Sequence, residues 1–235
     1  MKLVPMIWLV IIQLLLLCPC QIAQSGTWRD DFEDKATDEW TIYNLDRRVE
    51  KWWIEDGEAV GEIFHPGYMS LWLTGELSWR EYSVSCRAKL VEEKNDPATI
   101  GLTLHDRGEE DTRYLFFVEI TLGIVRIIKA TPNGWFIRHF PFVTEIDTWY
   151  VLKATINGEF MEFQVDDEVF VSRDLDPLKG GQAGLVVSDA RAHFDDIEIS
   201  GSNIKNGGPG RPRSVDEGRK LPTIWAKIKS NASAN

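Results

Sequence analysis

The feature that most constrains the fold is a period-two alternation of apolar and polar side chains that closes at residues 192–199. Apolar residues alternate with polar ones on both sides of the pair Asp195-Asp196, and a glycine-rich segment follows at once. Successive side chains of a β-strand point to opposite faces, so this pattern predicts a strand with one face on a core. We expect it to be the last strand of a β-sandwich and to lie beside the first, near residues 30–33.

The same alternation recurs at short intervals from residue 28 onward, and no segment has convincing helical periodicity. It is clear in residues 82–90, 100–105 and 150–156, and the last of these leads into Asn157-Gly158, a strong hairpin signal. About a dozen short strands joined by tight turns are typical of antiparallel sheets packed face to face. The sequence therefore predicts an all-β fold, a two-sheet antiparallel jelly-roll sandwich over residues 26–200.

The N-terminal residues 1–25 have the form of a secretory signal peptide. Lys2 is the only charged residue before Arg29, Leu3 to Leu17 is almost wholly apolar, and small residues lie near Ser25. A transmembrane anchor would need a longer apolar run, so we expect cleavage near Ser25 and no membrane span afterwards. This predicts a secreted or periplasmic protein. Only Cys86 of the three cysteines would then remain, and its place on an alternating strand predicts a buried, inert thiol.

The charge is divided unevenly along the chain. Residues 26–200 carry 18 Lys and Arg against 35 Asp and Glu, whereas residues 201–235 carry seven basic side chains against two acidic ones. An acidic domain repels polyphosphate, so we expect no nucleic-acid partner.

Composition changes again after residue 200. The run Gly207–Arg213 predicts a flexible linker within a basic, Gly/Pro-rich tail at residues 201–235. Residues 221–229 fit either a short helix capped by Thr223 or a disordered end. As a helix, this segment would be a docking peptide for a protein partner.

With the strands laid out, the chain resembles the concanavalin A-like lectin/glucanase jelly rolls. Within these it is most similar to the laminin-G-like and 3-keto-disaccharide hydrolase-like domains of exported bacterial proteins. The resemblance covers nearly all of residues 27–200 and is specific for the fold rather than for a ligand. It is carried by the order and spacing of seven short segments: residues 31–33, 53–60, 81–84, 149–154, 163–167, 181–185 and 194–197.

The resemblance implies carbohydrate as the ligand, bound on the concave sheet or at its rim. It also implies a structural calcium ion joining the first and last strands, with Asp195 as the side-chain ligand and Glu33 beside it, since hard oxygen ligands suit calcium. The alternative is that the aspartates of this strand are only solvated surface residues.

A catalytic pair of carboxylates is harder to find. Glucanases of this superfamily place them on one strand as Glu-x-Asp-x-(x)-Glu, because residues i and i+2 share a face. Glu119 is followed by Ile120-Thr121-Leu122, and Glu162-Phe163-Gln164 has an amide at the required position. The sequence thus disfavours a laminarinase-type enzyme, and His105 and Glu119 are the acid/base candidates for any other hydrolase activity.

The alternation also predicts a ligand-binding face. If the face opposite Leu102 and Leu104 is concave, the polar side chains on it point into one groove. Trp135 follows a turn, from which its ring can stack on a sugar ring. The alternative is the polar outer face of an ordinary sandwich. The candidate ligand-binding residues are Arg87, His105, Arg113, Glu119 and Trp135, and Trp52, Trp53 and Trp72 are further aromatic candidates.

Three functional hypotheses follow. The first is a secreted carbohydrate-binding module without a catalytic constellation. The second is a glycoside or 3-keto-disaccharide hydrolase. The third is a structural or adhesion module that binds a protein partner through its basic tail.

Overall fold

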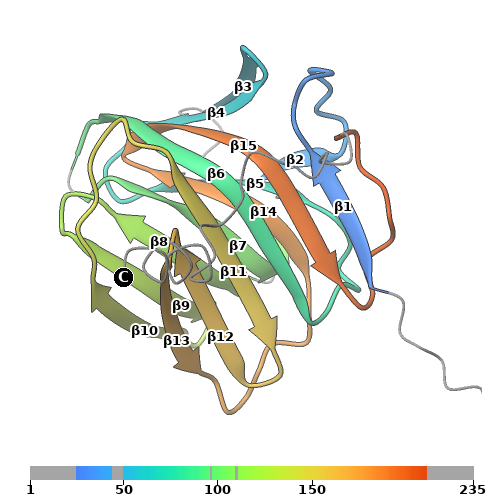
Figure 1. The fold of residues 1–235 in the computed structure, drawn as a ribbon. Coiled ribbons are helices and arrows are strands. Elements are labelled where there is room, and N and C mark those ends of the chain that lie inside the picture. The colour runs from blue at the N-terminus through green and yellow to red at the C-terminus, as the bar shows by residue number, and fades with distance from the viewer. Residues whose placement is uncertain (1–24, 44–49, 96, 109–110, 211–235) are drawn as a thin grey trace, which may run out of the picture.

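The computed structural model describes residues 25–43, 50–95, 97–108 and 111–210. They form fifteen strands in two antiparallel sheets, which Figure 1 shows as two packed layers. The predicted all-β sandwich is confirmed. The signal peptide and the segment 221–229 lie outside these residues, so both remain predictions. No helix in the described part of the chain is long and apolar enough to cross a membrane.

The first sheet has eight strands and contains both ends of the domain. The last strand runs antiparallel beside the first, as the sequence predicts (Figure 1), and the register places Asp30 opposite Ile197. The order is β13 (Glu168–Arg173), β12 (Phe160–Val165), β11 (Tyr150–Asn157), β6 (Tyr82–Glu93), β15 (Ala190–Gly201), β4 (Glu58–Ile63) and β3 (Glu50–Glu55), with β1 (Gly26–Asp30) also paired to β15.

The second sheet has seven strands, and every neighbouring pair in it is antiparallel. Its order is β10 (Gly134–Pro141), β9 (Ile124–Thr131), β8 (Arg113–Glu119), β7 (Thr99–Asp106), β14 (Gln182–Ser188), β5 (Met69–Thr74) and β2 (Trp40–Tyr43).

The main core lies between the sheets and is rich in aromatic rings. Trp72 stacks on Trp40 with ring centroids 4.8 Å apart and on Trp52 at 5.2 Å. Trp72 is buried there, which removes it from the aromatic candidates for ligand contact. Cys86 is buried in the same core, as its place on an alternating strand predicted.

A second apolar cluster covers the outer face of the seven-stranded sheet. Its buried members are Leu71, Leu73, Leu115, Phe117, Ile128 and Val186. On β8 they alternate with Tyr114, Phe116 and Val118 of the main core, so this strand is buried at every position. The centre of this outer face is therefore apolar and buried, where alternation suggested polar side chains.

Residues 207–210 differ from the linker predicted over Gly207–Arg213, whose last three residues lie outside the described part of the chain. Gly207 forms a parallel bridge to Trp28, and the N–H of Gly210 donates to the Arg29 carbonyl over 2.9 Å. Ile204 is buried in the main core. A Cβ atom at Gly208 would lie 2.0 Å from the Arg29 carbonyl oxygen. Glycine here permits close packing of this segment against β1 rather than flexibility.

Candidate functional site

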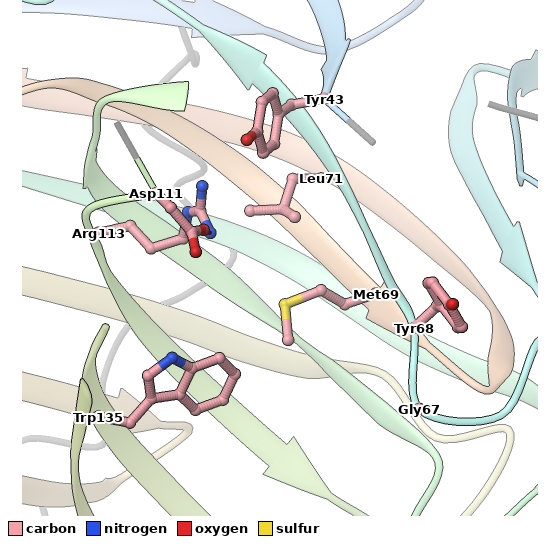
Figure 2. Close-up of a pocket in the computed structure, with 8 residues that line it drawn as sticks. All are labelled: Tyr43, Gly67, Tyr68, Met69, Leu71, Asp111, Arg113 and Trp135. Carbon is pink, nitrogen blue, oxygen red and sulfur yellow. Dashed lines mark hydrogen bonds and ion pairs between the residues drawn. The ribbon is translucent and has the colours of Figure 1, made fainter. Parts of the chain in front are cut away.

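A cavity of about 170 Å³ opens on the outer face of the seven-stranded sheet (Figure 2). Tyr43 comes from β2 at one edge of the sheet and Trp135 from β10 at the other. In a flat sheet, six strand spacings would hold these edges roughly 29 Å apart, so the shared cavity shows that this face is concave. We call the cavity the concave-face cavity. It is lined by Tyr43, Gly67, Tyr68, Met69, Leu71, Asp111, Arg113 and Trp135.

Two exposed aromatic side chains form opposite sides of the concave-face cavity. Figure 2 shows Trp135 and Tyr68 apart, with Met69 between them. Trp135 is 53% exposed because β10 is an edge strand whose outward side chains have no neighbour beyond them. The segment that carries Tyr68 is held in place, since Ser188 Oγ donates to the Tyr68 carbonyl over 2.7 Å and Asp189 Oδ2 accepts from Gly67 N–H over 3.3 Å.

The polar side of the cavity is a fixed ion-pair network around Arg113. Its Nε lies 2.9 Å from Oδ2 of Asp106, a fully buried carboxylate, and its Nη1 lies 2.6 Å from Oδ1 of Asp111. Burial would lower the pKa of Arg113, but the two aspartates outweigh it and hold the pKa above its usual value. The guanidinium carbon also lies 5.2 Å from the centre of the Tyr43 ring.

The concave-face cavity thus combines exposed faces of aromatic rings with the charged side chains of Asp111 and Arg113. The Asp111 side chain is 51% exposed and has acceptor capacity left beyond its bond to Arg113. Trp135 and Tyr68 offer flat apolar surface, and Met69 can adapt to an irregular shape. Such a lining suits a small molecule with apolar faces and hydroxyl groups at its edges.

His105 lies outside the concave-face cavity. It is 2% exposed at the end of β7, and its Nδ1 is 3.2 Å from the carbonyl oxygen of Leu178. Burial lowers its pKa to about 4, with a smaller contribution from the Arg80 charge, so the ring is neutral at physiological pH. His105 does not line the concave-face cavity.

Glu119 and Arg87 also lie outside the concave-face cavity. Glu119 is on the concave face but is buried against Arg126, with Oε2 and Nη2 3.0 Å apart, outside the cavity lining. Arg87 belongs to the eight-stranded sheet, where it pairs with Asp195 at 3.2 Å and covers the Trp149 ring at 4.5 Å. The single groove expected from the sequence therefore does not form. Only Arg113 and Trp135 of the five candidates share the cavity.

Sequence reasoning missed Tyr43, Tyr68 and Met69. Tyr68 and Met69 follow the turn at Pro66-Gly67, a segment without alternation. Residues 114–118 carried a signal for this site, because all five are apolar. A strand with one buried face needs an apolar residue only at every second position. That run indicates an apolar outer surface, and hence a second place to look for a ligand.

The calcium prediction finds no assembled ligand shell. The described residues contain no group of three or more His, Cys, Asp and Glu side chains arranged to hold a metal ion. Asp195 Oδ2 faces the Arg87 guanidinium, and its Oδ1 accepts from the Asp196 N–H over 2.7 Å. The Glu33 carboxylate lies instead against Gly57. Calcium binding stays a prediction.

Comparison with known proteins identifies solved structures with the same fold. No protein-family model and no curated protein sequence matches the chain. Among solved structures, the carbohydrate-binding module CBM66 from Bacillus subtilis is 19% identical, with a TM-score of 0.57 over 68% of this chain and 94% of that one. A Bacillus licheniformis β-glucanase is 9% identical, with a TM-score of 0.56 over 74% and 97%.

A third structure, a protein of unknown function with a galectin-like fold from Bacillus subtilis, is 10% identical, with a TM-score of 0.58 over 74% and 95%. At such identities the likeness concerns the fold alone. Together with the sheet order, it shows that the chain has the concanavalin A-like jelly-roll fold.

Proposed function

We propose that the domain binds carbohydrate in the concave-face cavity. The observation that carries the proposal is the exposed Trp135 ring beside the Asp111–Arg113 pair in one cavity. A sugar ring has apolar C–H faces and hydroxyl groups at its edge, so it needs an aromatic surface and charged hydrogen-bonding groups next to each other. Trp135 belongs to β10 and Arg113 to β8, so the sheet fixes both, and Asp111 is held by its contact with Arg113.

Each lining group has a separate role in this proposal. Trp135 stacks on one face of a sugar ring, and Tyr68 closes the opposite side. Asp111 accepts hydrogen bonds from sugar hydroxyls, while Arg113 orients Asp111 through their 2.6 Å contact. Asp106 anchors Arg113 from below the cavity and does not reach the ligand.

The structural neighbours support this ligand class. One is named as a carbohydrate-binding module and others as β-glucanases, so the same sandwich serves carbohydrate in several proteins. The function of a fold depends on its site, and here the site is the aromatic and charged cavity described above.

We also propose that the protein is secreted and acts by binding rather than by hydrolysis. The sequence lacks the glucanase carboxylate motif, and Glu119 is tied to Arg126 instead of facing the cavity. The β-glucanase neighbours keep glycoside hydrolysis as the second candidate. Release of reducing ends from β-1,3-1,4-glucan that is abolished by Glu119→Gln would favour this second candidate.

A glycan-array screen of residues 26–235, run with calcium and again with a chelator, tests the proposed function. We expect selective binding to a small set of glycans in both conditions, because the concave-face cavity contains no metal in this proposal. Loss of the signal with the chelator would instead support the calcium prediction for Asp195. An array with no signal in either condition would refute carbohydrate binding.

A further inference from the structure

A second cavity, of about 410 Å³, lies away from the concave-face cavity and shares no lining residue with it. It opens where the ends of β6 and β7 meet the turn after β11 and the loop before β14. Arg80, His105, Leu178 and Lys179 line it, with Glu81 and Asn203 at its sides. We call it the His105 pocket.

The His105 pocket gathers positive charge in an acidic domain. Arg80 and Lys179 are exposed, and neither has an ion-pair partner among the described residues. Elsewhere in the described structure, cations such as Lys129 and Arg126 face a carboxylate within 3.0 Å. Two unpaired cations at one cavity form a site for an anion.

His105 adds a buried acceptor without a partner. A carbonyl oxygen only accepts, so the Nδ1 atom that faces Leu178 must bear the proton, and Nε2 of the neutral ring carries a lone pair. Nε2 is buried and has no hydrogen-bond partner among the described residues. Its backbone is also in the left-handed region, with φ at 52°. Buried polar groups are nearly always satisfied, so an orphaned acceptor needs an explanation.

We propose that the His105 pocket binds a hydroxycarboxylate, a small anion that also carries hydroxyl groups, such as a free uronic acid. The carboxylate lies between Arg80 and Lys179, and a neighbouring hydroxyl donates to Nε2 of His105. The side chain of Leu178, which is half-buried at the pocket wall, moves aside so that the hydroxyl reaches the buried Nε2 of His105. This site is independent of the concave-face cavity.

Three probes separate the contributions to binding. Glucuronate has both groups, acetate has only the carboxylate, and glucose has only hydroxyls. We expect glucuronate to bind at least about tenfold more tightly than either of the others, measured by calorimetry at pH 7. Equal affinity for glucuronate and acetate would overturn the role of His105, and no binding of glucuronate would overturn the site.

The histidine nitrogen gives a direct readout. In long-range proton–nitrogen spectra of labelled protein, glucuronate should shift the Nε2 resonance of His105, because a lone pair that accepts a hydrogen bond changes its shielding. Acetate should leave it in place. An Nε2 resonance that does not move at saturating glucuronate would contradict the proposal.

Matched variants test the cations. Lys179→Ala should weaken glucuronate binding about tenfold, whereas Lys153→Ala, which removes an exposed cation outside the pocket, should not change it. Equal effects of the two variants would reduce the site to general electrostatic attraction and overturn the proposal. Trp135→Ala should leave glucuronate binding unchanged, so failure here and failure of the proposed function are distinguishable.

Discussion

Trp40 donates its indole N–H to the carboxylate of Asp30 inside the core, with Nε1 and Oδ2 2.7 Å apart. The other carboxylate oxygen accepts the N–H of Phe32 over 2.9 Å. Burial dominates over these two bonds and raises the pKa of Asp30 from 3.8 to about 6. The folded state therefore holds the proton at pH values where the unfolded chain releases it.

This pKa shift has a sign that can be tested. Between about pH 4 and pH 6 the folded state binds more protons at Asp30, so its contribution makes the domain less stable as the pH rises. The change amounts to roughly 3 kcal/mol across that window. Asp30→Asn should remove this decline while leaving an acceptor for one N–H. Urea denaturation at pH 4, 5, 6 and 7 measures it.

Asp167→Asn is the control for this series, because Asp167 is exposed in a turn. Its stability profile should run parallel to that of the wild type. If the Asp30→Asn profile also ran parallel to the wild type, Asp30 would not titrate as its burial requires.

The Asp106–Arg113 pair supports the floor of the concave-face cavity. Arg113→Met leaves a fully buried carboxylate without its cation, and we expect a loss of about 3–5 kcal/mol in the free energy of unfolding. Lys51→Met removes an exposed cation whose partner, the buried Glu62, keeps its ion pair with Arg191, so it should cost less than about 1 kcal/mol. Equal losses in chemical denaturation would mean that Arg113 is a surface cation of no special role.

Gly101 of β7 allows the Phe117 ring of β8 to cover the concave face. A Cβ atom there would lie 2.1 Å from the Phe116 carbonyl oxygen and 2.9 Å from the Phe117 ring. Gly101→Ala should therefore destabilise the domain by about 1–3 kcal/mol, seen as a lower denaturation midpoint. At Gly207 a Cβ meets nothing within 4 Å, so Gly207→Ala should leave the midpoint nearly unchanged. The reverse order would contradict the packing of this sheet.

The packing of residues 201–210 predicts a role for Ile204. Ile204→Ala should lower the free energy of unfolding by about 2–5 kcal/mol, because it opens a cavity in the main core. Leu175→Ala removes a side chain that is 73% exposed and should change stability by less than about 0.5 kcal/mol. A neutral Ile204→Ala would mean that the domain ends before this segment, as its composition suggested.

Alternation along the strands was enough to predict the sandwich and the pairing of β1 with β15. Core positions such as Leu102 and Leu152 followed directly, because each strand needs one face on the core. The packing of residues 207–210 could not be predicted, since glycine signals both a flexible linker and a close backbone contact.

The site residues were harder to predict from the sequence, because the site depends on which strands become neighbours in the sheets. Arg87 and Arg113 have similar surroundings in the sequence, yet they lie in different sheets. His105 occupies an outward position in the alternation, but its φ of 52° departs from the strand and its ring lies 5.3 Å from Tyr82 and 5.6 Å from Tyr114 of the main core. Tyr68 is held at the cavity by long-range contacts that Ser188 and Asp189 make with its segment, which the local sequence does not reveal.

Carbohydrate binding against Trp135 is tested most directly by comparing two exposed aromatic residues. A glycan selected on the array is titrated into wild type, Trp135→Ala and Phe160→Ala, and the Kd is measured by calorimetry. Phe160 is 54% exposed, like Trp135, but lies in the eight-stranded sheet. Our account predicts at least about tenfold weaker binding for Trp135→Ala and an unchanged Kd for Phe160→Ala. An unchanged Kd for Trp135→Ala would contradict it.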